Sequence, residues 1–183
     1  MQNETHKNYI LGAIIGDVIG SRFEFDNYKD IDFPLFSRES DFTDDSVLTF
    51  ATMSCIINED DYARTYQTFA RRYPDRGYGG FFNEWIYQKN PQPYNSWGNG
   101  SAMRVSPVGW AFNTLEEVLE NAKMSAEVTH DHPEGIKGAQ AVAAAIFLAR
   151  TKKSKSEIKN YLENKFNYDL SRSLNSIKKD YCF

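Results

Sequence analysis

Two adjacent carboxylates stand between two hydroxyls in the segment Thr43, Asp44, Asp45 and Ser46, directly before an apolar run of helical period over residues 47–57. A helix start exposes unpaired N–H groups and the positive end of the helix dipole, so one Thr or Asp there caps it well. Two neighbouring Asp residues exceed what a cap needs, and oxygen ligands suit Mg²⁺ or Mn²⁺. Two interpretations follow, a plain helix cap or a divalent-metal site.

An EF-hand calcium loop is one specific form of such a metal site. A loop starting at Asp41 would place Thr43 and Asp45 at its third and fifth positions. The rest of the pattern fails, because the sixth position is Ser46 instead of glycine and the twelfth is Thr52 instead of a bidentate Glu. Calcium signalling is therefore not expected.

A second acidic segment precedes this one. Gly12, Gly16 and Gly20 recur every four residues. On a helix they form one bare stripe, which predicts close packing against another backbone. The spacing is not that of a dinucleotide fingerprint. Asp17 lies in this segment and Glu24 just beyond it, and each either points at the same ion as the 43–46 segment or is an ordinary surface charge.

A glycine-flanked turn at residues 98–104, Gly-Asn-Gly-Ser-Ala-Met-Arg, leads into a short helix. Such a turn can offer backbone N–H groups to a phosphate, with Arg104 as a bidentate partner. An Asn-Gly pair also occurs simply as a turn, so both interpretations stay open.

Two histidines, His130 and His132, lie in the stretch Thr-His-Asp-His-Pro at residues 129–133. No Cys or third His accompanies them, which argues against a zinc site. A helix-entry loop with a substrate-contacting histidine is the alternative.

Helical periodicity dominates the chain, and no segment keeps the two-residue alternation of a half-buried strand. The sequence predicts a mostly α-helical single domain over residues 1–183. Thr114 with Glu117 and Ser154 with Glu157 match capping boxes, and Pro133 suits a first helical position. The expected helices span residues 8–21, 45–58, 60–73, 80–88, 101–111, 115–127, 134–150, 155–165 and 171–179.

Two turn-rich stretches interrupt this pattern, at residues 74–80 (PDRGYGG) and 90–100 (NPQPYNSWGNG). The second is long for a simple connector. Because long loops in small domains are often functional, we expect it to form one wall of a ligand site.

Composition and charge exclude several classes of protein. With 41% hydrophobic residues the chain is expected to fold, and no apolar run reaches the roughly 20 residues of a membrane span. The polar start Met1 to Asn8 carries no secretory or lipidation signal, so a cytoplasmic location is expected. A net charge of −4 argues against general nucleic-acid binding. Cys55 and Cys182 match no disulfide or zinc pattern and are expected to be inert.

Taken in order, five segments of the chain resemble the ADP-ribosylglycohydrolase family, over a stretch from about residue 10 to at least residue 150. They are residues 12–25 (GAIIGDVIGSRFEF), 42–49 (FTDDSVLT), 77–85 (GYGGFFNEW), 96–110 (SWGNGSAMRVSPVGW) and 129–141 (THDHPEGIKGAQA). The ordered set is far more specific than any one motif.

The resemblance implies an all-α orthogonal helical bundle with a pair of Mg²⁺ or Mn²⁺ ions in a central cleft. It implies an enzyme that removes ADP-ribose from modified protein side chains or from a related small ADP-ribosyl substrate. By position, Thr43, Asp44 and Asp45 resemble the first half of the metal-ligand set, and Glu24 resembles the acidic residue close to that centre. Glu24, Asp44 and Asp45 are thus the expected catalytic residues.

The same resemblance places the ribose and diphosphate of the substrate. Asn99, Gly100, Ser101 and Met103 fall in the loop that binds these groups in the family, and His130 matches a residue that lines the same cleft.

One departure from the family concerns the metal site. The family completes it with a motif near its C-terminus, Gly-Gly-Asp-(Ser/Thr)-Asp-Thr, which this sequence lacks, since Asp169 and Asp180 are isolated. We therefore expect a truncated family domain with at most a partial metal site. Two alternatives to an active hydrolase follow, an inactive module that binds ADP-ribose or a related nucleotide, and an incomplete fragment that self-associates.

Overall fold

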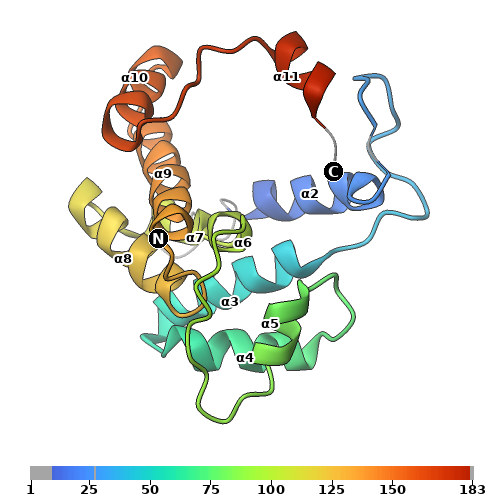
Figure 1. Ribbon diagram of the computed structural model, residues 1–183, viewed down its shortest axis with the longest axis vertical. Helices are drawn as coiled ribbons and strands as arrows, with labels where there is room; N and C mark the ends of the chain where they lie inside the picture. Colours follow the sequence, from blue (N-terminus) through green and yellow to red (C-terminus); the bar gives the residue numbers. More distant parts are fainter. Residues whose placement is uncertain (1–9, 27, 182–183) are drawn as a thin grey trace, which may run out of the picture.

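The chain folds into helices that cross one another at steep angles, and no strand occurs among residues 10–26 and 28–181, which the computed structural model describes (Figure 1). The all-α prediction is thus confirmed. No helix in this part of the chain is long and apolar enough to cross a bilayer. The predictions for Met1 to Asn8 and for Cys182 lie outside the described residues. The elements are α2 (Leu11–Gly20), η1 (Ser21–Phe23), α3 (Asp44–Asn58), α4 (Tyr62–Arg72), α5 (Gly80–Trp85), α6 (Gly100–Met103), α7 (Ser106–Ala111), α8 (Leu115–Glu127), α9 (Pro133–Arg150), α10 (Lys155–Phe166) and α11 (Leu174–Asp180).

Local capping signals set three of the helix starts. Thr114 and Ser154 each accept the backbone N–H of a Glu three residues on, whose carboxylate returns to the cap, so both predicted capping boxes are confirmed. Pro133 is the first residue of α9, as predicted. Its N-cap is His132, whose Nδ1 accepts the backbone N–H of Glu134 at 3.1 Å. His132 therefore caps α9.

The single helix predicted over residues 101–111 is wrong, because the segment divides into α6 and α7. Pro107 explains the division. A proline has no N–H to donate to the carbonyl four residues earlier, and its ring collides with that carbonyl, here on Met103. The chain therefore ends one helix at Met103 and begins another at Ser106, with the proline in the first turn, where no donor is needed.

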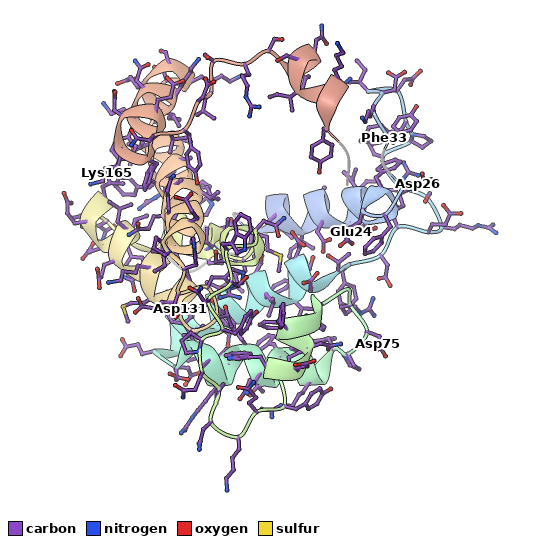
Figure 2. All side chains as sticks on the ribbon, viewed as in Figure 1. Glu24, Asp26, Phe33, Asp75, Asp131 and Lys165 are labelled. Atoms are coloured by element: carbon purple, nitrogen blue, oxygen red, sulfur yellow. The ribbon has the colours of Figure 1, made fainter. Side chains whose placement is uncertain are left out.

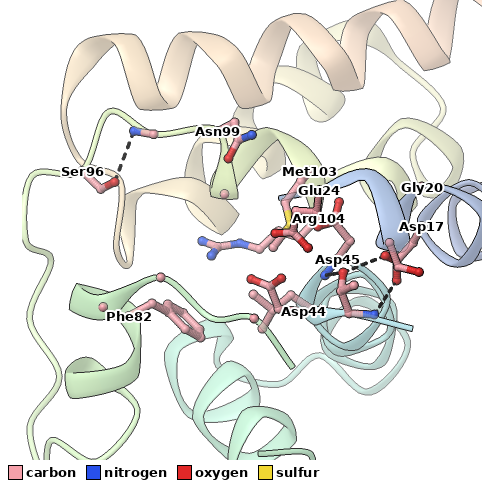
Figure 3. Close-up of a pocket in the computed structure, with 18 of the residues that line it drawn as sticks. Asp17, Gly20, Glu24, Asp44, Asp45, Phe82, Ser96, Asn99, Met103 and Arg104 are labelled. Atoms are coloured by element: carbon pink, nitrogen blue, oxygen red, sulfur yellow. Dashed lines mark hydrogen bonds between the residues drawn. The ribbon is translucent and has the colours of Figure 1, made fainter. Parts of the chain in front are cut away.

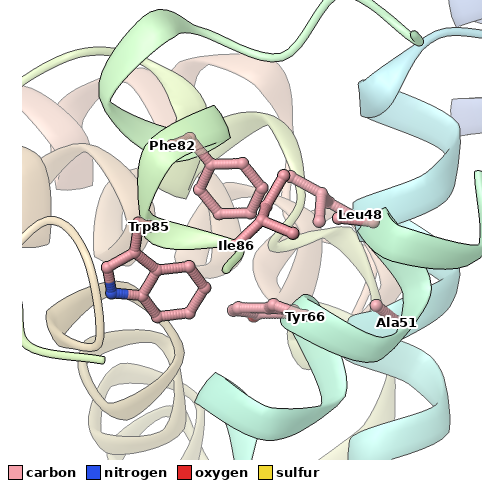
Figure 4. Close-up of a cluster of buried hydrophobic side chains, with 7 residues drawn as sticks. Leu48, Ala51, Tyr66, Phe82, Trp85 and Ile86 are labelled. Carbon is pink, nitrogen blue, oxygen red and sulfur yellow. The ribbon is translucent and has the colours of Figure 1, made fainter. Parts of the chain in front are cut away.

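One hydrophobic core lies between α3, α4 and α5 (Figure 4). Trp85 and Tyr66 are fully buried there, and Phe82 stacks on Trp85 with ring centroids 5.3 Å apart. Cys55 on α3 is also buried, and burial raises the pKa of its thiol to about 11, as expected of an inert cysteine. The fully or nearly buried members of this core are Leu48, Ala51, Tyr66, Ala70, Phe82, Trp85 and Ile86.

A second core joins α7, α8 and α9 through small side chains. Gly109 shows why they are small, since a Cβ at this position would lie 2.7 Å from the side chain of Ile146 and 2.8 Å from the carbonyl oxygen of Ala143. Helices α7 and α9 therefore cross at a distance that only glycine permits. This crossing carries α6, and with it the 98–104 turn, on the face of α9.

The glycine stripe on α2 does not have its predicted role in the described residues. A Cβ on Gly12, Gly16 or Gly20 would meet no atom within 4 Å outside its own helix. No backbone packs against the stripe, so the packing prediction is wrong for this part of the chain. Gly16 and Gly20 instead line a pocket.

Candidate functional site

A pocket of about 710 Å³ lies where α2, α3, α5 and α6 meet, a size typical of small-molecule sites. All five motif segments of the sequence contribute to its wall, including the long 90–100 loop. Among the residues predicted for the site, those that line it are Asp17, Glu24, Thr43, Asp44, Asp45, Asn99, Gly100, Met103, Arg104 and His130. The acidic segment and the glycine-asparagine turn therefore share one cavity.

Asp17 on α2 organises the acidic side of the pocket. Its carboxylate accepts hydrogen bonds from the backbone N–H and the hydroxyl of Thr43, at 2.9 and 2.6 Å, and from the backbone N–H of Ser46 at 3.1 Å. The hydroxyl of Ser46 donates to it as well. Asp17 thus caps α3 from a neighbouring helix, so it is not an ordinary surface charge, and its contact with a metal ion stays a prediction.

The caps supplied by Thr43 and Asp17 leave the carboxylates of Asp44 and Asp45 free to face the pocket. The hydroxyl of Thr43 also accepts the backbone N–H of Asp45 at 3.3 Å. The ion pairs of the described residues all involve other groups, so neither Asp is balanced by a Lys or Arg. Burial, followed by the negative charge of Asp45, raises the pKa of Asp44 to about 7. Burial and the charge of Asp17 raise the pKa of Asp45 to about 6.

Glu24 approaches the same space from η1. It lies just beyond α2 and close to the start of α3 (Figure 2), and its carboxylate points toward that of Asp44 on the same side of the pocket (Figure 3). Burial, followed by repulsion from Asp17, raises the pKa of Glu24 above its ordinary value. The pocket therefore has one wall of uncompensated carboxylates.

The loop over residues 74–80 holds this wall in place. The backbone N–H of Asp44 donates to the carbonyl of Arg76 at 2.7 Å, and the guanidinium of Arg76 pairs with Asp41 at 2.6 Å and lies 3.8 Å above the ring of Phe42. Gly77 follows with φ +90°, which favours glycine, and a Cβ there would lie 3.6 Å from a carboxylate oxygen of Asp44. The sequence did not predict this role of Arg76, because the group that holds Asp44 is a backbone carbonyl, which every residue type has.

The opposite wall is the 96–103 turn. Asn99, Gly100 and Met103 line the pocket, whereas the buried hydroxyl of Ser101 donates to the carbonyl oxygen of Gly135 at 2.8 Å. The side chain of Ser101 therefore fixes α6 to α9. Gly135 fits only as glycine, since a Cβ there would lie 2.7 Å from the carbonyl oxygen of Ser96.

Arg104 has an internal position that the sequence did not predict. It is fully buried beneath the turn, and its Nη2 donates to the carbonyl of Ser125 at 2.8 Å and to the hydroxyl of Thr129 at 2.9 Å. Its guanidinium lies 4.2 Å above the ring of Tyr66. Arg104 also lines the pocket, so these contacts hold the guanidinium at the pocket wall, and its role as a phosphate partner stays a prediction.

His130 continues from Arg104 to the pocket. Its side chain is only 5% exposed, and its Nδ1 lies 2.8 Å from the hydroxyl of Thr129. Gly100 leaves room for the imidazole, since a Cβ there would lie 3.2 Å from Nε2. Burial and the positive charge of Arg104 lower the pKa of His130 to about 3, so the imidazole is neutral at physiological pH.

The donor set has the chemistry of a hard divalent ion. Asp44 and Asp45 offer carboxylate oxygens whose pKa values are raised by burial and by neighbouring negative charges, and Mg²⁺ is commonly held by one or two carboxylates with water and substrate oxygens. Among residues 10–26 and 28–181, no three His, Cys, Asp or Glu side chains converge as a ready-made metal site. These residues therefore fit an open site that leaves most positions to other ligands. Asp169, one of the two isolated late aspartates, is not part of the pocket wall.

Comparison with known proteins supports the family resemblance of the five motif segments. The sequence profile of the ADP-ribosylglycohydrolase family matches residues 4–179. ADP-ribosylhydrolase ARH3 of Homo sapiens is 30% identical to this chain in an alignment that covers 81% of this chain and 50% of the relative. The proteins of the same name from Mus musculus and Xenopus tropicalis are 28% and 29% identical, covering 81% and 76% of this chain and 50% and 49% of their own lengths. The chain spans about half the length of the curated relatives it matches.

Proposed function

Because the chain belongs to the ADP-ribosylglycohydrolase family, we propose that it hydrolyses the bond between ADP-ribose and a modified protein side chain with the help of a divalent metal ion. The observation that carries the proposal is one pocket with two unlike walls. Unpaired carboxylates form one wall, and the turn with Asn99, Arg104 and His130 forms the other. The first suits a metal ion and the reacting sugar carbon, and the second suits the ribose and diphosphate.

The bond to be broken joins C1 of the distal ribose to a protein oxygen or nitrogen. Cleavage of such bonds passes through an oxocarbenium-like transition state, which nearby carboxylates stabilise by their negative charge. Asp44 and Asp45 would hold Mg²⁺ or Mn²⁺ beside this carbon. When bound, such an ion orients water and sugar hydroxyls and makes that water more acidic.

Glu24 is the residue that we assign to proton transfer. Its raised pKa lies closer to neutrality than that of an ordinary Glu, which favours exchange of a proton with the attacking water or the leaving group. The 98–100 turn and His130 would meanwhile hold the ribose and diphosphate, fixing C1 next to the acidic wall.

The test is hydrolysis of peptides carrying ADP-ribosyl-serine or ADP-ribosyl-arginine, with Mg²⁺, with Mn²⁺ and with a chelator. We expect turnover with a divalent ion, none with the chelator, and a loss of about 100-fold or more in Glu24→Gln. Asp44→Ala is expected to lose most of its metal affinity and its turnover. Asp32→Asn, at an exposed loop position outside the pocket, is the matched control. Equal turnover by wild type and Asp44→Ala would refute the assignment.

A second candidate function is binding of ADP-ribose without hydrolysis. It is favoured by one observation, the absence of a three-ligand acidic group among the described residues. Calorimetry with ADP-ribose, with and without Mg²⁺, separates the two candidates when it is combined with the turnover assay. Micromolar binding without turnover selects the binding module, and no binding excludes both.

A further inference from the structure

Three buried polar side chains, Arg104, Thr129 and His130, form a continuous hydrogen-bonded series that ends at the pocket. None of the described carboxylates forms an ion pair with Arg104, and its guanidinium is fully buried. A buried charge is costly unless it is hydrogen-bonded, and the bonds from Arg104 to Ser125 and Thr129 offset part of that cost.

The first hydrogen bond has a fixed direction. Nη2 of Arg104 can only donate, so the Thr129 hydroxyl oxygen, 2.9 Å away, accepts. The same nitrogen donates its other proton to the carbonyl of Ser125 at 2.8 Å. Thr129 is therefore left with one proton of its own to donate.

Two acceptors lie within reach of that proton. One is the carbonyl oxygen of Ala126, at 3.5 Å from the Thr129 hydroxyl, and the other is Nδ1 of His130, at 2.8 Å. The Ala126 carbonyl already accepts the backbone N–H groups of Thr129 at 3.1 Å and His130 at 2.8 Å, and that of Val128, which leaves it no lone pair for the hydroxyl. The hydroxyl proton consequently goes to Nδ1.

The last step sets the state of the imidazole. A neutral histidine whose Nδ1 accepts a hydrogen bond carries its proton on Nε2. Nε2 lies beside Gly98 and Gly100 at the pocket wall, and no described residue accepts a hydrogen bond from it. We propose that Arg104 and Thr129 are positioning residues that lock His130 in the Nε2–H tautomer, so that it enters the pocket as a hydrogen-bond donor.

The proposal specifies what His130 can recognise. A fixed N–H donor matches an acceptor oxygen, such as a phosphate oxygen or a ribose hydroxyl, and it cannot serve as a base at Nε2. This consequence for ligand binding rests on the proposed function, whereas the tautomer itself does not.

The tautomer can be measured directly by long-range ¹H–¹⁵N correlation NMR on the full chain labelled with ¹⁵N-histidine. The chain has three histidines, and a His132→Gln variant assists the assignment of His130. We expect a protonated Nε2 and an unprotonated Nδ1 in wild type. A protonated Nδ1 would overturn the proposal, and because this measurement needs no variant in the series, it decides the matter even if such variants fold poorly.

Two variants test the role of the hydroxyl. Thr129→Val removes it with little change of shape, and we expect a mixture of tautomers and an ADP-ribose affinity about tenfold lower, the effect of one hydrogen bond. Thr129→Ser keeps the hydroxyl and should restore both properties. An NMR spectrum of Thr129→Val that matches the wild-type spectrum would refute the role of the hydrogen-bonded series in setting the tautomer.

The outcomes separate this proposal from the proposed function. If wild type has the Nε2–H tautomer but neither binds nor hydrolyses an ADP-ribosyl substrate, the proposed function is refuted and the tautomer proposal is supported. If wild type hydrolyses the substrate but has a protonated Nδ1, the tautomer proposal is refuted and the proposed function is supported.

Discussion

The clearest physical consequence of the clustered carboxylates of Glu24, Asp44 and Asp45 is that their mutual repulsion should lower the free energy of unfolding at neutral pH. Burial and neighbouring carboxylates move the pKa of Asp44 from 3.8 to about 7. That change corresponds to about 4 kcal/mol at pH 8, which solvent screening at this partly exposed side chain reduces to about 2 kcal/mol. A pKa raised by folding means that the stability contribution is present at low pH and is lost as the pH rises from about 4 to about 7.

Asp44→Asn removes this charge while keeping the shape of the side chain. In the presence of a chelator we expect the variant to match wild type near pH 4 and to exceed it by about 2 kcal/mol at pH 8, or about 4 to 8 °C in melting temperature for a domain of this size. Thermal and urea unfolding followed by circular dichroism measure the difference, and Asp32→Asn is the control. Parallel pH profiles for wild type and Asp44→Asn would refute the charge-crowding argument.

A divalent ion should reverse the penalty. Mg²⁺ at a hundred times its dissociation constant should stabilise wild type by about 2.7 kcal/mol at pH 8. The effect should be smaller at pH 5, where protons compete for the same oxygens. Asp44→Asn should gain little at either pH. Equal stabilisation of both proteins by Mg²⁺ would show that the ion is not held by this carboxylate.

Three further perturbations follow from the contacts. Asp17→Asn should lower the free energy of unfolding in urea by about 2 to 4 kcal/mol, because an amide cannot accept all the hydrogen bonds that Thr43 and Ser46 donate at the start of α3. An unchanged free energy of unfolding would contradict this. Gly100→Ala should weaken ADP-ribose binding in calorimetry by displacing the imidazole, and an affinity equal to that of wild type would refute the packing argument. The pKa of His130 is lowered to about 3, so its contribution to stability should be complete above pH 6.5 and be lost as the pH falls towards about 3. The stability advantage of wild type over His130→Asn should therefore shrink by about 2 kcal/mol as the pH falls, and a constant difference would contradict this.

Much of the fold follows from signals that act within a few residues. The capping boxes at Thr114 and Ser154 and the proline at position 133 mark helix starts because the groups that satisfy the first N–H donors lie in the same segment. The division between α6 and α7 was equally local, since Pro107 forbids a continuous helix through that point. The sequence contained this signal, and the apolar periodicity on both sides of the proline concealed it.

The roles of the glycines depended on neighbours that the sequence does not reveal. Gly109 and Gly135 permit close approaches to α9 and to the Ser96 carbonyl, yet neither belongs to a periodic pattern. The periodic stripe on α2 has no such neighbour among the described residues. Spacing shows which face of a helix is bare, and only tertiary structure shows whether anything occupies it.

The candidate site divides in the same way between local and tertiary causes. The motif segments predicted which residues meet in the pocket, but they could not rank three aspartates of the same chemical type. Asp17 is surrounded by N–H and hydroxyl donors from a helix 26 residues away in the chain, and so it holds the fold together. Asp44 and Asp45 have fewer such donors, because Asp17 already accepts the N–H and hydroxyl groups at the start of α3, and burial raises the pKa values of both carboxyls. The cap supplied by Asp17 is therefore what leaves the other two aspartates at the pocket wall, where our proposal places the metal ion.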